Sequence, residues 1–180
     1  MKLRGYTLAI ILGALIIMAN CAPEKDETTT RDRPEPPPPA KILVQPDSTS
    51  YPGTNEESEV SILVEGVSNV YSVSFDLSYN PDILTYESGT IGTGGFLGPA
   101  DDTLFKTSLL SDGPGTLVVG ITRQKDISSD GESGSGELCV LKFRTIGKGI
   151  TDLRLINHAV LDPDGGAISV ISEDSQITVN

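Results

Sequence analysis

Residues 70–82 read VYSVSFDLSYNPD, and this stretch decides the fold. Apolar and small polar side chains alternate along its first ten residues. The apolar series is Tyr71, Val73, Phe75 and Leu77, and the polar series is Ser72, Ser74, Asp76 and Ser78. Alternation with a period of two is typical of a β-strand that buries one face and exposes the other. The Asn-Pro-Asp triplet that follows is a turn signal, so we predict a half-buried strand over residues 70–79.

The rest of residues 41–180 has the same character, with short alternating or β-branched runs separated by Gly, Asp, Asn and Pro. No stretch has a helical period. Residues 83–87 resume extended structure after the turn that ends residues 70–79. Further strands are expected at residues 42–45, 59–65, 103–110, 116–122, 137–145, 151–156, 167–171 and 176–179. Turn signals stand at residues 112–115 and 164–166, and residues 124–136 are expected to form a polar loop. About nine short strands with such closely spaced turns predict an all-β domain of two packed antiparallel sheets, a β-sandwich or a jelly roll.

The first twenty residues have the composition of a secretory signal peptide. Lys2 and Arg4 give a basic start, the apolar run TLAIILGALIIMA fills residues 7–19, and polar sequence begins at Asn20. The run is shorter than the ~17–25 residues that a membrane-spanning helix needs. We therefore predict an exported protein with a signal peptide at residues 1–20, and an uncleaved signal anchor is the alternative.

Residues 18–21, MANC, resemble the lipobox of bacterial lipoproteins, in which the cysteine is lipidated and becomes the mature N-terminus. The resemblance implies lipid attachment at Cys21 and anchoring to the bacterial cell envelope, with the domain outside the cytoplasm. Residues 22–40 are rich in Pro, Thr and charge, so they are expected to form a disordered, extended spacer. The expected organisation is a signal peptide at 1–20, the anchor cysteine and linker at 21–40, and a folded domain at 41–180.

Charge and cysteine content exclude several classes of protein. The chain has 13 basic and 25 acidic residues, for a net charge of −12. This charge argues against nucleic-acid binding and against attraction to anionic lipids. Cys21 and Cys139 are the only cysteines, so a disulfide framework is not expected. Because Cys139 stands in an apolar strand pattern, we expect it to be a small core residue.

Residues suited to catalysis or metal binding are sparse. His158 is the only histidine, and no nucleophile motif stands beside it, so a hydrolytic triad is not expected. Residues 162–165, DPDG, begin like an acidic calcium loop but lack its closing glutamate, and Asp-Gly turn chemistry explains them. We predict that the protein is not an enzyme and uses no metal or cofactor.

Three segments in order resemble cohesin domains: residues 75–84 (FDLSYNPDIL), 136–143 (GELCVLKF) and 157–165 (NHAVLDPDG). The similarity covers residues 42–180. It implies a nine-stranded jelly-roll sandwich that docks dockerin modules of other proteins, and so places polysaccharide-degrading or surface proteins at the cell envelope. Carbohydrate-binding modules share a related fold, so a polysaccharide ligand is an alternative, although the chain has no tryptophan to stack on sugar rings.

Two predicted strands carry small or lightly polar residues on one side. Along residues 116–122, Val118, Gly120 and Thr122 alternate with the apolar Leu117, Val119 and Ile121 and so lie on the opposite side of the strand. If this strand lies beside residues 70–79, the two would form a flat plate able to receive a partner helix. The predicted partner-binding residues are Ser72, Ser74, Asp76, Val118, Gly120 and Thr122. A generic cell-surface adhesion lipoprotein, and a solvated outer sheet without a partner, are the other interpretations.

Overall fold

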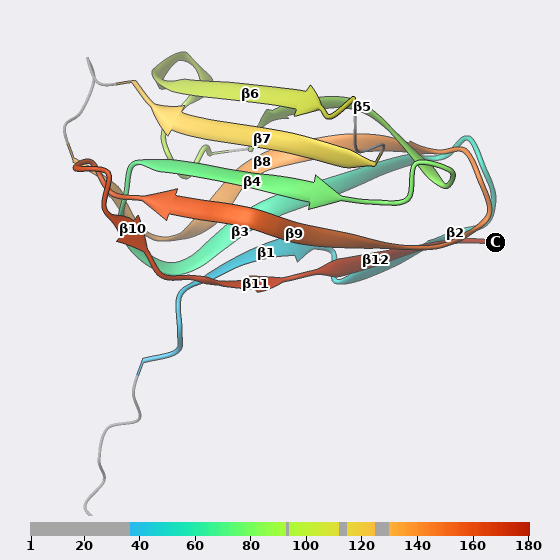
Figure 1. Cartoon of the computed structure of the whole chain (residues 1–180), viewed down its shortest axis with the longest axis horizontal. Coiled ribbons are helices and arrows are strands. Elements are labelled where there is room, and N and C mark those ends of the chain that lie inside the picture. The colour runs from blue at the N-terminus through green and yellow to red at the C-terminus, as the bar shows by residue number, and fades with distance from the viewer. Residues whose placement is uncertain (1–36, 93, 112–114, 125–129) are drawn as a thin grey trace, which may run out of the picture. The chain divides into compact units, whose positions relative to one another are not determined.

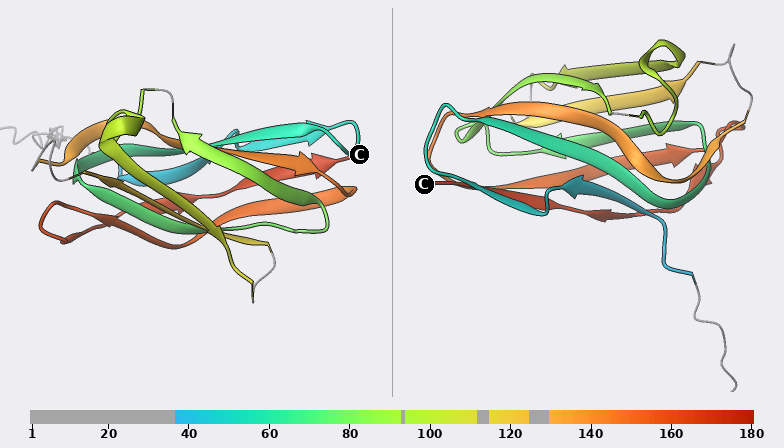
Figure 2. Two further views of the ribbon diagram at one scale, coloured as in Figure 1. Left: turned by 90° about the horizontal axis from the view of Figure 1, so that it is seen from above. Right: turned by 180° about the vertical axis from the view of Figure 1, so that it is seen from behind.

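The computed structural model describes residues 37–92, 94–111, 115–124 and 130–180. Two β-sheets pack face to face over these residues (Figures 1 and 2), and the only helical turn among them is the 3₁₀ segment η1, Ala100–Asp102. The predicted all-β sandwich is confirmed. The predicted signal peptide, Cys21 and most of the predicted linker lie outside the described residues, as do residues 112–114 and 125–129 of the predicted turn and loop.

One sheet has five strands in the order β11-β1-β3-β8-β5. Their bounds are β1 Lys41–Gln45, β3 Glu57–Val70, β5 Leu84–Ile91, β8 Glu132–Thr145 and β11 Ile171–Glu173. The other sheet follows the order β2-β12-β9-β4-β7-β6, with β10 paired to β9. Its strands are β2 Ser48–Tyr51, β4 Ser72–Ser78, β6 Thr103–Leu109, β7 Thr116–Arg123, β9 Gly149–Leu161, β10 Ala167–Ile168 and β12 Ser175–Val179.

The strand inventory differs from the predicted nine antiparallel strands. The described residues form twelve, and the pairs β1–β11 and β2–β12 are parallel. The predicted strand at 167–171 is divided between β10 and β11, which pair with β9 and β1 respectively. Strand β2, STSY, was not predicted because it has no apolar period. Short edge strands like these form through backbone pairing, which leaves little pattern in the side chains.

Strand β8 begins inside the predicted polar loop. Residues 132–136, ESGSG, pair with the end of β3, where Val67 lies opposite Gly134 and Val70 opposite Glu132. The register shifts at these points mark β-bulges, which bend both long strands. The loop prediction was therefore wrong for this segment, since backbone ladder bonds hold a sequence with no strand propensity.

The core lies between the two sheets and is built by the predicted alternation. Val73, Phe75 and Leu77 of β4 are each at most 1% exposed. From the opposite sheet, Phe143 meets the Tyr79 ring edge-on at a centroid distance of 5.1 Å and the Tyr86 ring at 5.6 Å. Such pairs add about 0.5–1.5 kcal/mol beyond the area they bury. The core position predicted for Cys139 is confirmed, and burial, followed by the charge of Glu137, raises the pKa of its thiol.

Candidate docking face

The two strands that carry the predicted binding residues are antiparallel neighbours in the larger sheet. The register sets the six residues directly opposite one another in three pairs, Ser72 with Thr122, Ser74 with Gly120 and Asp76 with Val118. The residues that alternate with them, Val73, Phe75 and Leu77 on β4 and Leu117, Val119 and Ile121 on β7, are buried, so the six side chains lie on the outer surface of the sandwich. Ser74 is exposed and the other five are partly exposed.

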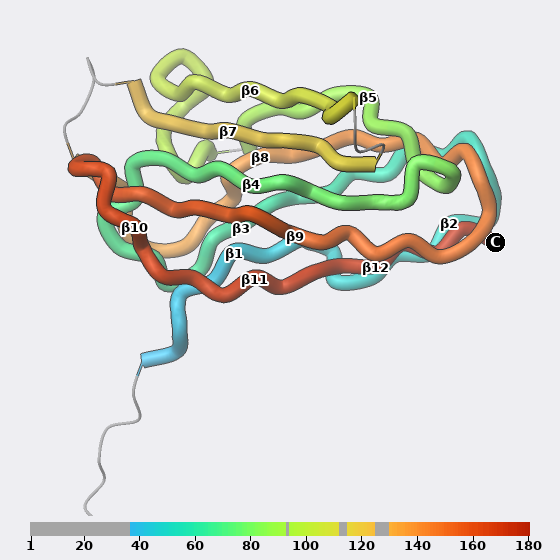
Figure 3. Tube along the Cα trace, in the orientation of Figure 1, coloured from blue at the N-terminus to red at the C-terminus, as the bar shows by residue number. Residues whose placement is uncertain are grey.

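Strands β6 and β9 extend this surface on both sides, so that β6, β7, β4 and β9 lie side by side in that order (Figure 3). Each pair thereby becomes a row of four. The rows are Leu104–Thr122–Ser72–Leu161, Lys106–Gly120–Ser74–Ala159 and Ser108–Val118–Asp76–Ile156. We call these residues, together with Asn157, the docking face. Its two middle strands carry the smaller side chains, while leucine and isoleucine stand on the outer two.

Residues on β6 and β9 were not among the predicted site residues. Leu104 is 47% exposed and Ile156 is 41% exposed, so both side chains are open to a partner. Alternation in the predicted strand at 103–110 does place Leu104, Lys106 and Ser108 on one side. Which strand lies beside them is a matter of tertiary pairing, so the sequence had no signal that joined them to the site.

A bulge in β9 positions the acidic group of the docking face. Ser74 lies opposite Ala159, but Asp76 lies opposite Ile156, so β9 has one extra residue between these pairs. Asn157 sits at this point with φ +50°, a conformation that asparagine tolerates better than most residues. Its side-chain amide donates a hydrogen bond of 2.8 Å to Asp76 Oδ2. The bond orients a carboxylate that keeps further lone pairs for a partner.

A shallow hollow of about 230 Å³ lies over Gly120 on the docking face. Strands β4, β6 and β7 form its walls, and its lining residues include Ser72, Ser74, Leu104, Lys106 and Thr122. The Lys106 side chain is exposed at this hollow, and it makes no ion pair with any residue in the described ranges. The hollow thus combines apolar walls with one cationic group.

The outer surface of the five-stranded sheet is different, because its charges are already paired with one another. Lys142 Nζ lies 2.7 Å from Glu59 and 3.2 Å from Glu57, and hydrogen bonds to these two carboxylates raise its pKa. Arg144 Nε lies 2.5 Å from Glu87, whose hydrogen bond likewise raises the pKa of the guanidinium. A partner on this surface would have to break these exposed pairs, whereas the docking face offers apolar and unpaired groups.

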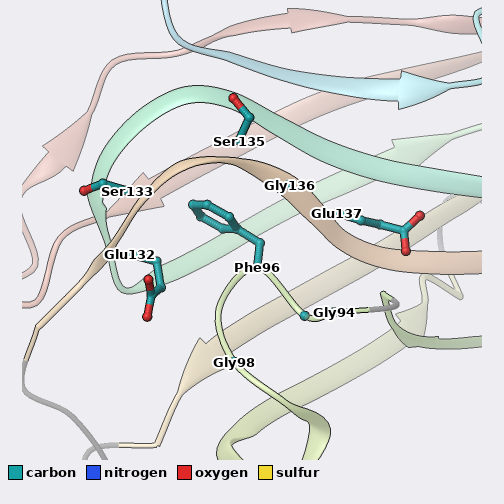
Figure 4. A pocket seen from close by; sticks show the side chains of 9 residues that line it. Gly94, Phe96, Gly98, Glu132, Ser133, Ser135, Gly136 and Glu137 are labelled. Atoms are coloured by element: carbon teal, nitrogen blue, oxygen red, sulfur yellow. The ribbon is translucent and has the colours of Figure 1, made fainter.

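A second hollow, of about 400 Å³, lies between β8 and the glycine-rich loop at residues 94–98 (Figure 4). The Phe96 ring lies between Glu132 and Glu137, and it is the aromatic residue among those that line the hollow. Glu132 is paired with Arg123, and Phe96 also packs against the core. The Phe96 amide also donates a hydrogen bond of 3.0 Å to the Glu137 carbonyl, which holds the loop against β8. The single Phe96 ring, beside a Glu132 that is already paired with Arg123, is a weak platform for stacking a sugar ring.

The acidic turn at residues 162–165 is satisfied by its own backbone. Asp162 Oδ1 accepts hydrogen bonds from the amides of Asp164 (2.9 Å) and Gly166 (2.7 Å). Asp-Gly chemistry therefore accounts for this turn, as the sequence indicated. Within the described part of the chain, no group of three or more His, Cys, Asp or Glu side chains is placed to hold a metal ion.

The fold is that of a β-sandwich module, and the docking face is its candidate binding surface. The chain belongs to the cohesin family, because the cohesin domain family matches residues 43–179. Cohesin domains are non-catalytic binding modules that typically work outside the cell or at its surface. Among curated proteins, none matches the chain significantly. No helix in the described residues is long and apolar enough to cross a membrane.

Solved cohesin structures share the fold at low sequence identity. A non-cellulosomal cohesin from the archaeon Archaeoglobus fulgidus is 22% identical, with a TM-score of 0.63 over 79% of this chain and 92% of its own. The sixth cohesin of scaffoldin B from Acetivibrio cellulolyticus, solved with a Cel5 dockerin, is 15% identical, with a TM-score of 0.65 over 79% of this chain and 100% of its own. A type I cohesin–dockerin complex from Clostridium thermocellum gives 12% identity and a TM-score of 0.66, over 81% and 98%.

Proposed function

We propose that this protein is a lipid-tethered docking module that binds a dockerin-type partner through the docking face. The partner would contribute an α-helix, laid across β6, β7, β4 and β9. In this role the module holds its partner at the cell envelope and performs no chemistry on it. A polysaccharide-degrading or surface protein is the cargo that the family relationship favours.

The size and smoothness of the docking face carry this proposal. Four strands about 4.8 Å apart span roughly 14 Å, which corresponds to about nine residues of an α-helix that runs across them at about 1.5 Å per residue. The two middle strands offer small groups such as Ser74 and Gly120, so a helix can approach the sheet closely. Leu104, Leu161 and Ile156 on the outer strands supply apolar contacts at its flanks. Exposed apolar groups that gather on one face are a feature of protein-interaction surfaces.

Two further observations support the proposal. Similar solved cohesins are described in complexes with dockerins, among them those from Acetivibrio cellulolyticus and Clostridium thermocellum. In addition, the surface of the other sheet is occupied by its own ion pairs, as at Lys142 and Arg144. The membrane tether is inferred from the sequence at residues 1–40, where Cys21 is the proposed lipid site.

Titration of the purified full chain, in mild detergent, against dockerins from the same organism tests the function. We expect saturable binding to at least one of them, and Gly120→Arg should abolish it. The backbone at this site accepts a side chain, because a Cβ at Gly120 would meet no atom within 4 Å. The matched control is Thr90→Arg, at an exposed residue of β5 on the other sheet. Equal binding by both variants would contradict the docking face as the site.

Soluble polysaccharide, titrated in parallel, separates the docking function from its main alternative. The docking proposal expects no binding of polysaccharide at concentrations that saturate the dockerin site. Binding of polysaccharide in the absence of any dockerin binding would instead establish a carbohydrate-binding module. If that binding were lost on replacing Phe96 but kept in Gly120→Arg, it would lie at the hollow beside the glycine-rich loop.

A further inference from the structure

The absence of a side chain at Gly120 has no explanation inside the domain. Its φ does not lie in the left-handed region, and an added Cβ would meet no atom within 4 Å. Neither the backbone nor the packing therefore requires glycine. Glycine in the middle of a strand is destabilising relative to alanine, and it often marks a place where another molecule approaches closely. Here it leaves the hollow of about 230 Å³ open.

Two opposite charges flank this hollow. Lys106 lies directly opposite Gly120 on β6 and has no ion pair within the described residues. Asp76 lies two strands away from Lys106, on β4, and its hydrogen-bond partner among the described residues is the neutral amide of Asn157. By contrast Arg154, on the adjoining part of β9, is paired with Asp152 at 2.7 Å. The docking face thus offers a partner the hollow, one cation and one anion, and neither charge has an ion pair within the described residues.

The register fixes the spacing of these three groups. Lys106 and Gly120 share a row, and Asp76 lies in the next outward-facing row. With strands about 4.8 Å apart and about 6.7 Å between such rows, the Cα atoms of Lys106 and Asp76 are about 12 Å apart. Projected on the line between them, Gly120 lies about 4 Å from Lys106. At a rise of about 1.5 Å per residue, these positions correspond to residues i, i+3 and i+7 or i+8 of a helix.

From this spacing we propose a recognition code for the partner, which rests on the proposed function. The partner helix carries an acidic residue for Lys106, an aliphatic residue about three positions along for the hollow over Gly120, and a basic residue seven or eight positions along for Asp76. These positions lie on a single helical face. The aliphatic side chain anchors the helix, and the two charges set its direction on the sheet.

A display library tests the code while the natural partner is unidentified. The probe is a small helical-bundle scaffold with one exposed helix face randomised, selected against the full chain in mild detergent. Enriched clones should carry an acidic and a basic residue seven or eight positions apart, with an aliphatic residue between them. Gly120→Leu and Lys106→Glu should each weaken these clones at least tenfold, while Thr90→Arg leaves them unchanged. Clones without this pattern, or an absence of any enriched clone, would overturn the inference.

A charge exchange sharpens the assignment of Lys106. Binding lost in Lys106→Glu should return when the acidic residue of the clone is replaced by lysine, and it should not return when the basic residue is replaced. If replacing the basic residue of the clone restored binding instead, the helix would lie on the sheet in the direction opposite to the one proposed. A dockerin that binds but is indifferent to Gly120→Leu and Lys106→Glu defeats the code and leaves the proposed function standing. Library clones with the pattern, in the absence of any dockerin binding, defeat the dockerin proposal and leave the code standing.

Discussion

Asn157 and Asp76, 81 positions apart in the chain, are joined by a hydrogen bond of 2.8 Å across strands β9 and β4. The bond depends on the bulge in β9, because the extra residue brings Asn157 beside Asp76 with φ +50°. A β-bulge that aims a polar side chain at a site is a recurrent device in sheets. The acidic group of the docking face is therefore positioned by a local irregularity of the neighbouring strand.

The backbone at Asn157 can be separated from its side chain by two substitutions. Asn157→Gly should keep the bulge and change the free energy of unfolding by less than about 1 kcal/mol, since glycine adopts positive φ without strain. Asn157→Val should cost about 1–3 kcal/mol, because a β-branched residue is strained in that region. Urea unfolding of both variants measures the difference. Equal losses would show that the hydrogen bond, not the backbone, dominates.

Phe75 is expected to be a main determinant of stability. Its side chain is 1% exposed in the centre of the core, so Phe75→Ala should lower the free energy of unfolding by about 3–5 kcal/mol. Ser74→Ala, one residue away on the exposed face, should change it by less than about 0.5 kcal/mol. Urea unfolding again provides the measurement. A loss below about 1 kcal/mol for Phe75→Ala would contradict the assignment of inner and outer faces of β4.

Two glycines with opposite surroundings make a matched pair. A Cβ added to Gly147 would lie 2.1 Å from the backbone oxygen of Asp82, so Gly147→Ala forces two turns apart and should cost about 1–3 kcal/mol. Gly120→Ala meets no atom and should be neutral or stabilising by up to about 1 kcal/mol. Thermal unfolding of the two variants side by side tests this. A destabilised Gly120→Ala would mean that glycine is needed for folding, which would remove a basis of the recognition code.

Asp152 should titrate below the ordinary range. The hydrogen bond from Gln176, followed by that from Arg154, lowers its pKa from 3.8. Because the folded pKa is the lower one, the stabilisation is present above pH 3.8 and is lost as the pH falls through the folded pKa. Gln176→Ala should raise this pKa toward its ordinary value and reduce stability only above it. Carboxyl titration by NMR measures the shift, and an unchanged pKa in the variant would refute the role of Gln176.

Cys21 is expected to carry lipid. Metabolic labelling with a fatty-acid analogue should mark the wild-type chain and leave Cys21→Ala unlabelled, and Cys139→Ala should label like the wild type because that thiol is buried. Fractionation should place the labelled chain with the membranes. Equal labelling of the Cys21→Ala and wild-type chains, or a soluble wild-type protein, would contradict the lipid anchor.

Much of the domain was determined locally, by the sequence itself. The alternation of residues 70–79 decides which side of β4 is buried, because successive side chains of a strand point to opposite faces. The same holds for β7, where Leu117, Val119 and Ile121 are all buried. The sandwich class, the core position of Cys139 and the outward direction of Ser74 and Gly120 follow from such patterns alone.

Only the tertiary structure decided which strands are neighbours, and with them the full docking face. Backbone hydrogen bonds join strands whatever their side chains are, so the polar residues 132–136 can pair with β3. In the same way, the pairing of β6, β7 and β4 places Leu104 in one row with Thr122 and Ser72. The bulge at Asn157 likewise depends on its partner strand. The tertiary structure also decided which outer surface has its charges engaged in ion pairs. Lys142 reaches Glu57 and Glu59 only when β8 and β3 are paired in register.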